Sequence, residues 1–212
     1  MLQKVIFKEE VRKILLAHIL TGHIKPGQRI SLPGIARELQ LSVTPIREAL
    51  TQLSETGIVV YIPNRGFFLT ELSAREAKEV YQLMAVMEGY AVRHSEFNSK
   101  QIEELKRINR SFIKAKSALK MLDYDRRFHQ KLIETFPNQA AHKILENLRV
   151  KISLYDYAFW NEEQKMTSIT MHEKIIKLLE AQQIDEAVQY IEENWIQGID
   201  YIVTKFEQHQ SI

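Results

Sequence analysis

The sequence contains no cysteine, and its 212 residues include only seven glycines and five prolines. Without cysteine the chain forms no disulfide and has no thiol nucleophile, so any metal site must use His, Asp, Glu or Asn ligands. No apolar run is long enough to span a bilayer, and the first residues lack the apolar core of a secretory signal. We therefore expect a cytoplasmic protein with no membrane partner.

A large excess of one charge is also missing, since 29 Lys and Arg face 27 Asp and Glu. The charge is nevertheless uneven along the chain. Residues 1–72 hold nine basic and six acidic residues, whereas residues 73–212 hold twenty and twenty-one. A modestly basic front third is compatible with a small DNA-contacting module joined to a neutral domain. Because the same charge asymmetry also arises by chance, it does not by itself indicate DNA binding.

The front third, residues 1–72, has the pattern of three helices followed by a hairpin. Apolar residues at helical spacing predict helices at 4–21, 32–39 and 43–55. Residues of high β propensity on both sides of residues 63–66 predict two short strands joined by a turn. This order of elements is typical of a winged helix-turn-helix, in which the third helix enters the major groove of DNA.

The candidate DNA contacts lie at the start of the third helix and at the hairpin tip. Short hydroxyl side chains in a first turn let a helix approach the bases closely, and the helix dipole favours phosphate there. A cation at the hairpin tip suits the adjacent DNA backbone. The expected contacts are Arg37, Ser42, Val43, Thr44, Arg47, Asn64, Arg65 and Gly66.

The rest of the chain, residues 73–212, shows no strand signal and reads as a separate all-α domain. Successive amphipathic patterns are broken at Asn98, Pro137, Asn161 and Gln182. The fold class is therefore mainly α, with a winged helix at 1–72 and a helical bundle at 73–212. The expected helices of the bundle are 73–95, 99–119, 121–136, 138–159, 165–181 and 184–208.

One stretch of the bundle, "LDYDRRFHQKL", carries chemistry. Asp125 and His129 are four residues apart, so they share a helix face and are able to bind one metal ion. Such a pair by itself is more often a surface pair. His172, which precedes a second apolar stripe, is by itself more often a histidine at a helix boundary.

The front third resembles the GntR family of bacterial winged-helix regulators. The resemblance covers residues 5–70 and rests on "GHIKPGQRI", "LSVTPIREAL" and "PNRGFF", which stand in the family's order. The family usually has an arginine at position 43 that contacts guanine, whereas this chain has Val43. The resemblance therefore implies one missing base contact, which an apolar contact to a thymine methyl is able to replace.

The bundle resembles the FCD-type effector domain of one GntR subfamily, whose members often hold a divalent metal with one Asp and three His. Asp125, His129 and His172 match three ligands, and the fourth falls at Asn194. Three hypotheses follow: zinc completed by a water, a harder ion such as nickel, manganese or magnesium, or a pocket kept for an organic ligand. We favour a retained but weaker site for zinc, nickel or manganese, although His142 is near enough in sequence to substitute.

The same resemblance implies a homodimer that binds a double-stranded operator under the control of a small-molecule effector, an organic acid or another metabolite. An arginine common in the subfamily is replaced by Met84, while Glu88 is kept, which weakens the case for a simple carboxylate effector. Arg149 and Tyr155 are weaker candidates to line the pocket. The alternatives are a metal-dependent hydrolase and an adaptor that dimerises without binding DNA. We favour the regulator, which is not an enzyme.

Overall fold

The computed structural model describes residues 11, 14–19, 23–159 and 161–210. The chain divides into two compact units, Met1–Leu72 and Ser73–Ile212. Much of the first expected helix, 4–21, lies outside the described residues, and its described residues 14–19 are helical. The described elements of the front unit are α2 (Leu32–Glu38), α3 (Val43–Glu55), β1 (Val59–Ile62) and β2 (Gly66–Leu69).

Helix α3 forms because one of its faces is apolar. Ile46, Ala49, Leu50 and Leu53 recur at helical spacing and have no exposed surface. Burying this stripe supplies most of the helix's stability, since a helix of this length is marginal by itself. The opposite face, with the start of the helix, remains in solvent.

The wing is a two-stranded antiparallel hairpin, in which Val59 pairs with Leu69 and Ile62 pairs with Gly66. Its turn is closed by the Arg65 N–H, which donates to the Ile62 carbonyl at 3.0 Å. Asn64 occupies the left-handed region at φ 62°, which asparagine tolerates better than most residues. The wing predicted from the sequence is confirmed.

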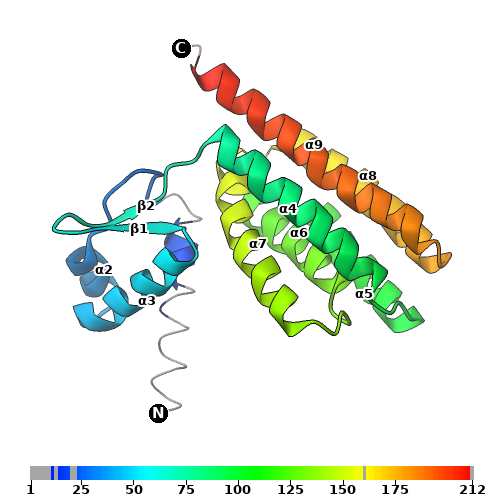
Figure 1. Ribbon diagram of the computed structural model, residues 1–212, viewed down its shortest axis with the longest axis horizontal. Coiled ribbons are helices and arrows are strands. Elements are labelled where there is room, and N and C mark those ends of the chain that lie inside the picture. The colour runs from blue at the N-terminus through cyan, green and yellow to red at the C-terminus, as the bar shows by residue number, and fades with distance from the viewer. Residues whose placement is uncertain (1–10, 12–13, 20–22, 160, 211–212) are drawn as a thin grey trace. The chain divides into compact units, whose positions relative to one another are not determined.

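Over its described residues, the regular elements of the second unit are all helices, which confirms the expected class (Figure 1). Helices α4 and α9 pack along each other in opposite directions. They approach closely at Gly89, where an added Cβ would lie 3.0 Å from Val188 Cγ1. The helices are α4 (Ala74–Arg93), α5 (Ser99–Lys114), α6 (Ala118–Leu132), α7 (Gln139–Phe159), α8 (Glu162–Glu180) and α9 (Ile184–Gln210).

The boundary between α5 and α6 differs from the prediction, in which the helix that begins at residue 99 continued to residue 119. Helix α5 ends at Lys114, and the Ser117 hydroxyl caps α6 by accepting the Lys120 N–H. The carbonyl of Ala115, which the helix end leaves without a helical donor, accepts from Lys165 Nζ at 2.9 Å. The prediction was wrong here because the apolar spacing continues through the break between the two helices. The contact with Lys165, which is fifty residues away in the chain, cannot be read from that spacing.

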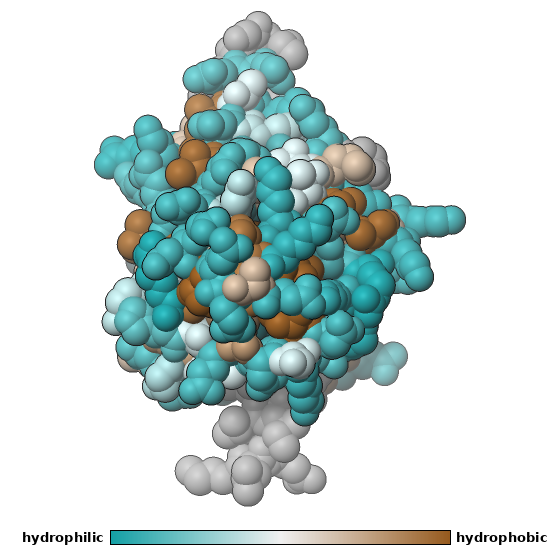
Figure 2. Space-filling model, turned by 90° about the vertical axis from the view of Figure 1, so that its right-hand side faces the viewer, coloured by the Kyte–Doolittle hydropathy of each residue, from teal (hydrophilic) through white to brown (hydrophobic). Residues whose placement is uncertain are grey.

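The face of the molecule drawn in Figure 2 is mostly hydrophilic, with small groups of hydrophobic residues between the polar ones. Isolated exposed apolar residues are normal on a folded protein. Among the described helices, none combines the length and apolar content that crossing a membrane requires.

Candidate functional site

Helices α4, α6, α7 and α8 bring a cluster of ionisable side chains into the interior of the second unit. Glu88, His129, Arg149 and His172 are all buried, and Asp125 lies beside them. Burying charged groups is costly unless they are paired or hold a cation. The cluster is therefore the place in this unit where a chemical role is to be sought.

Three of these residues point their ligand atoms at one another. His129 Nε2 lies 3.9 Å from Asp125 Oδ2, and His172 Nε2 lies 3.5 Å from Asp125 Oδ1. The ligand atoms of all three lie within 4.8 Å of one another. The spacing of Asp125 and His129 on α6 places them together. His172 is held against α6 by stacking on Phe128, with the two ring centres 3.7 Å apart. The structure thus gathers the three residues that the sequence singled out.

The opposite ring nitrogens of both histidines are held by hydrogen-bond acceptors. His129 Nδ1 lies 2.5 Å from Glu88 Oε1, and His172 Nδ1 lies 3.1 Å from Asn109 Oδ1. A histidine whose Nδ1–H donates to an acceptor turns its Nε2 lone pair outward, which is the usual arrangement of metal-binding histidines. The carboxylate and the amide therefore orient both imidazoles for metal binding.

Two of the converging atoms lack a hydrogen-bond partner among the described residues, although both are buried: Asp125 Oδ1 and His172 Nε2. Burial raises the pKa of Asp125 to about 6. Burial also lowers the pKa of His172 well below its ordinary value, so this imidazole is neutral near pH 7. A divalent cation would satisfy both atoms and the carboxylate charge, so the residues present fit a metal ion.

Glu88 is the buried counter-charge of the cluster. Burial alone would raise its pKa, but His129 and Arg149 outweigh this effect and lower it. For His129 burial lowers the pKa, and the neighbouring Glu88 more than reverses that shift. Arg149 Nη2 donates to Glu88 Oε2 at 3.0 Å, and Trp195 Nε1 donates to Oε1 at 3.3 Å. Glu88 is therefore an ionised carboxylate held by three helices besides its own.

The fourth expected ligand, Asn194 on α9, lies beside this group, with its Nδ2 3.4 Å from His129 Nε2. Rotating the amide by half a turn presents Oδ1 to the same place. His142 lies elsewhere: its Nε2 is 2.8 Å from the Phe136 carbonyl oxygen. The only metal-type group found in the described part of the chain does not include His142.

A small pocket opens beside the cluster. Its volume of about 20 Å³ is room for a water-sized molecule, so a larger ligand requires side chains to move. Arg149 lines the pocket, and its buried Nε has no hydrogen-bond partner among the described residues. Tyr155 is not in the lining, and its hydroxyl donates to Glu76 Oε2 at 2.7 Å. The lining residues are Leu122, Asp125, Arg126, His129, Arg149, Ile152, Ser153, Asp156 and Trp195.

In the front unit, the predicted contacts on α3 share one exposed surface. Ser42 is the N-cap, but its hydroxyl makes no hydrogen bond to the first turn. Val43, Thr44 and Arg47 are exposed. Arg37 lies on α2, where its Nε donates to the Pro33 carbonyl at 3.3 Å. The start of α3 therefore presents unsatisfied N–H groups, a hydroxyl and an apolar side chain to solvent, and Arg47 adds a cation one turn further along.

At the wing tip, Asn64 and Arg65 are exposed, and Gly66 adopts φ 97°. The Arg65 guanidinium lies 5.3 Å from the centre of the Phe68 ring. Arg29, which the sequence pattern did not single out, has its side chain beside Gly66. Its place in "GHIKPGQRI" carried the family resemblance, but nothing local in the sequence connects it with the wing.

A winged helix joined to a helical unit with a buried polar site defines a class of ligand-responsive DNA-binding proteins. Residues 7–69 match the family model described as "Bacterial regulatory proteins, gntR family", and residues 79–195 match the FCD domain. The chain therefore belongs to the GntR family of bacterial regulators and carries an FCD domain. FCD domains often bind metals.

Relatives across most of the chain are transcriptional regulators. The chain is 29% identical to the Nta operon transcriptional regulator of Aminobacter aminovorans, over 80% of this chain and 81% of that protein. It is 24% identical to the HTH-type transcriptional repressor RspR of Escherichia coli K12, over 96% and 91%. These relatives identify a DNA-binding transcriptional regulator with an effector domain, and they favour neither the hydrolase nor the adaptor.

Solved structures show the same fold. A putative GntR regulator from Rhodococcus sp. RHA1 superposes with a TM-score of 0.81 at 21% identity, covering 93% of this chain and 97% of that one. Escherichia coli McbR superposes with a TM-score of 0.78 at 21% identity, covering 94% and 98%.

Replacing Glu88 by alanine should destabilise the metal-free protein by about 3–5 kcal/mol, because Arg149 and His129 lose their buried counter-charge. Urea denaturation monitored by circular dichroism measures this free energy of unfolding. Glu79→Ala is the matched control, since Glu79 lies on the same helix but pairs with Arg75 at the surface. Equal losses in the two variants would contradict the role assigned to Glu88.

Proposed function

We propose that this regulator binds its operator as a cytoplasmic homodimer, and that a small molecule bound beside a divalent metal ion controls the binding. The observation that carries the metal is the pair of buried atoms, Asp125 Oδ1 and His172 Nε2, which converge without hydrogen-bond partners among the described residues. The family membership of the chain supports the regulatory role.

Asp125, His129 and His172 would hold the ion, and Asn194 would stand at the fourth position. A bound divalent cation supplies positive charge and open positions for an oxygen-bearing ligand. An amide oxygen is neutral and a poorer zinc ligand than imidazole, so the proposed site binds zinc, nickel or manganese more weakly than a site with three histidines. Arg149, which lines the pocket and whose buried Nε has no hydrogen-bond partner among the described residues, would receive an acidic group of an organic acid or a similar metabolite.

Helix α7 connects this pocket with the start of the second unit, so it is the element through which we propose that ligand binding acts on the DNA-binding unit. Arg149, Ser153 and Asp156 on α7 line the pocket. On the same helix, Lys151 pairs with Glu76 and Tyr155 donates to Glu76, next to the boundary between the units.

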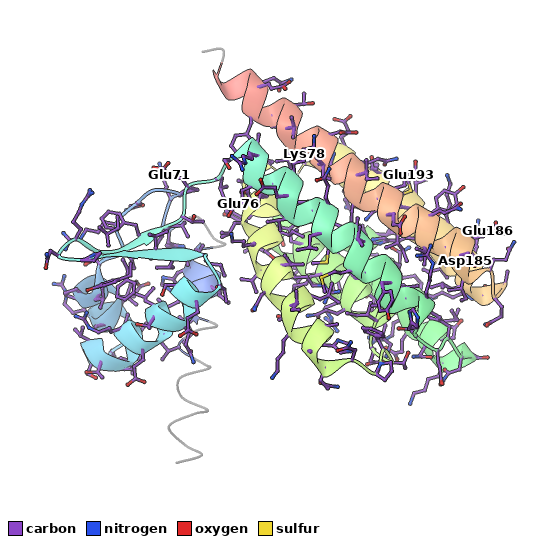
Figure 3. All side chains as sticks on the ribbon, in the orientation of Figure 1. Glu71, Glu76, Lys78, Asp185, Glu186 and Glu193 are labelled. Carbon is purple, nitrogen blue, oxygen red and sulfur yellow. The ribbon has the colours of Figure 1, made fainter. Side chains whose placement is uncertain are left out.

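Figure 3 labels Glu76 at the beginning of α4, beside α7. The Tyr155 oxygen also lies 3.4 Å from the backbone nitrogen of Ser73, the first residue of the second unit. A ligand that displaces α7 would thereby displace the residues that follow the DNA-binding unit. The protein would then have two arrangements, one that binds DNA and one that does not. The ligand controls DNA binding only to the extent that it binds one of these arrangements more tightly than the other.

The homodimer is supported by an exposed apolar stripe on α4. Leu83, Val86 and Tyr90 follow one another at helical spacing, and their exposed fractions are 47%, 66% and 54%. A stripe of this kind suits a two-fold interface in which the same helix of a second copy covers it.

Purified wild-type protein should contain about one divalent ion per chain, and zinc, nickel or manganese at about a hundred times Kd should stabilise it by about 2.7 kcal/mol. His172→Ala should lose both the ion and the stabilisation, because it removes a ligand. Asn194→His should tighten zinc binding, whereas the control Gln197→His, nearly one turn further along α9, should not. Elemental analysis and thermal denaturation measure these outcomes. A wild-type protein that neither contains nor responds to metal would contradict the metal site.

Arg47→Ala should weaken binding to an operator selected from random duplexes by about 1–3 kcal/mol, because its side chain is expected to contact a base edge. Fluorescence anisotropy measures the affinity. The control is Arg110→Ala, an exposed arginine on α5 in the other unit. Unchanged operator affinity in the Arg47 variant would remove this residue from the DNA contacts.

Val86→Asp should convert the dimer to a monomer, since it buries a carboxylate in an apolar interface. Analytical ultracentrifugation measures the mass in solution. Met166→Asp is the matched control, because Met166 is equally apolar and 59% exposed but lies on α8. A Val86 variant that stays dimeric, or a wild-type protein that is monomeric, would rule out this interface.

A further inference from the structure

We propose that Arg29 is a second cation of the wing and contacts the DNA phosphate backbone together with Arg65. This inference rests on the DNA binding proposed above and adds a residue that precedes α2 in the chain. It makes the wing a composite of the hairpin and of the segment that leads into α2.

Residues 27–30 lie along the free edge of β2 and extend the two-stranded sheet. The Gly27 N–H donates to the Leu69 carbonyl at 3.0 Å, and the Leu69 N–H donates to the Gln28 carbonyl at 2.9 Å. The Ile30 N–H donates to the Phe67 carbonyl at 2.8 Å. These hydrogen bonds fix the position of Arg29 relative to the hairpin.

The register of this pairing decides which way Arg29 faces. Arg29 stands opposite Phe68, and Phe68 stands opposite Val60 on the other strand. Paired residues share a face of the sheet, and successive residues alternate between faces. Since Phe67 and Leu69 are buried, the face that carries Arg29, Phe68 and Val60 is the outer one. Arg29 itself is exposed.

The Arg29 side chain lies beside Gly66, close to the tip of the wing. A Cβ built at Gly66 would make ordinary van der Waals contacts with it, 3.7 Å from Nε and 3.8 Å from Nη2. The Arg65 guanidinium stands over the Phe68 ring, at 5.3 Å from its centre. Two guanidinium groups are therefore associated with the same few residues of β2, close to the turn.

Neither guanidinium is neutralised within the described part of the chain, where no carboxylate forms an ion pair with Arg29 or Arg65. Two unpaired cations near one another repel, and a surface of closely spaced negative charges relieves the repulsion. Duplex DNA is such a surface, with a phosphate charge for about every 1.7 Å of its axis. The planar guanidinium also matches phosphate oxygens in a two-pronged contact.

The competing explanation is that Arg29 only packs its methylene stem against Gly66 and Phe68. Substitution by methionine separates the two roles, because it keeps an unbranched stem and removes the charge. Substitution by lysine keeps the charge and loses the two-pronged geometry.

The test measures the affinity of the full-length chain for a random-sequence duplex of about 30 base pairs by fluorescence anisotropy over a range of salt concentrations. Such binding needs no knowledge of the operator, because phosphate contacts are independent of sequence. Each phosphate contact contributes about 0.9 to the slope of log K against log salt. Arg29→Met and Arg65→Met should each reduce the slope by about one, and the double variant by about two.

Arg29→Lys should keep the wild-type slope, and the control Arg110→Met should not change it. Circular dichroism and thermal melting confirm that each variant is folded, and Arg29→Lys keeps the test valid if the methionine variant is unstable. An unchanged slope for folded Arg29→Met, or a lowered slope for Arg29→Lys, overturns the inference. A wild-type chain without salt-dependent duplex binding overturns the proposed DNA binding itself, and this inference with it.

Discussion

The second unit depends on one buried carboxylate, that of Glu88. It accepts from Arg149 on α7 and from Trp195 on α9, and it holds His129 of α6 by its Nδ1. A carboxylate without exposed surface is tolerated only where several donors replace its lost water. The same contacts tie α6, α7 and α9 to α4 and direct His129 Nε2 toward Asp125. Fold stability and site geometry therefore rest on the same interaction.

This shared support explains how a pocket of water-sized volume can belong to an effector domain. The site lies at the junction of helices rather than in an open cleft, so a ligand larger than a water molecule requires side chains to move. In the proposed function such a ligand also displaces α7. Helix α7 contacts Glu76 at the beginning of α4 through Lys151 and Tyr155, so in the proposed function its displacement reaches the start of the second unit. Packed helices change between discrete arrangements rather than deforming continuously, and such elements transmit binding energy.

The front unit has the opposite design. Its core is apolar, with the buried stripe of α3 as its centre, and its functional groups stand outside on rigid supports. The start of α3 offers a hydroxyl at Ser42 and an apolar group at Val43, while the wing carries Arg65 at its tip. Val43, where the family usually has arginine, leaves base reading to fewer polar groups. In the proposed function, backbone contacts from the wing then carry a larger share of the free energy of DNA binding.

Most of the helices, the hairpin and the Asp125–His129 pair could be predicted from the sequence, because periodicity, turn residues and i,i+4 spacing are local properties. His172 was a ligand candidate only through the family resemblance. Helix packing was needed to bring these three residues together, to place Glu88 and Asn109 against the imidazoles, and to end α5 at Lys114. The tertiary structure also placed Tyr155 away from the pocket and Arg29 against the wing. These outcomes depend on contacts between residues far apart in the chain, and helix packing, rather than any local pattern, creates such contacts.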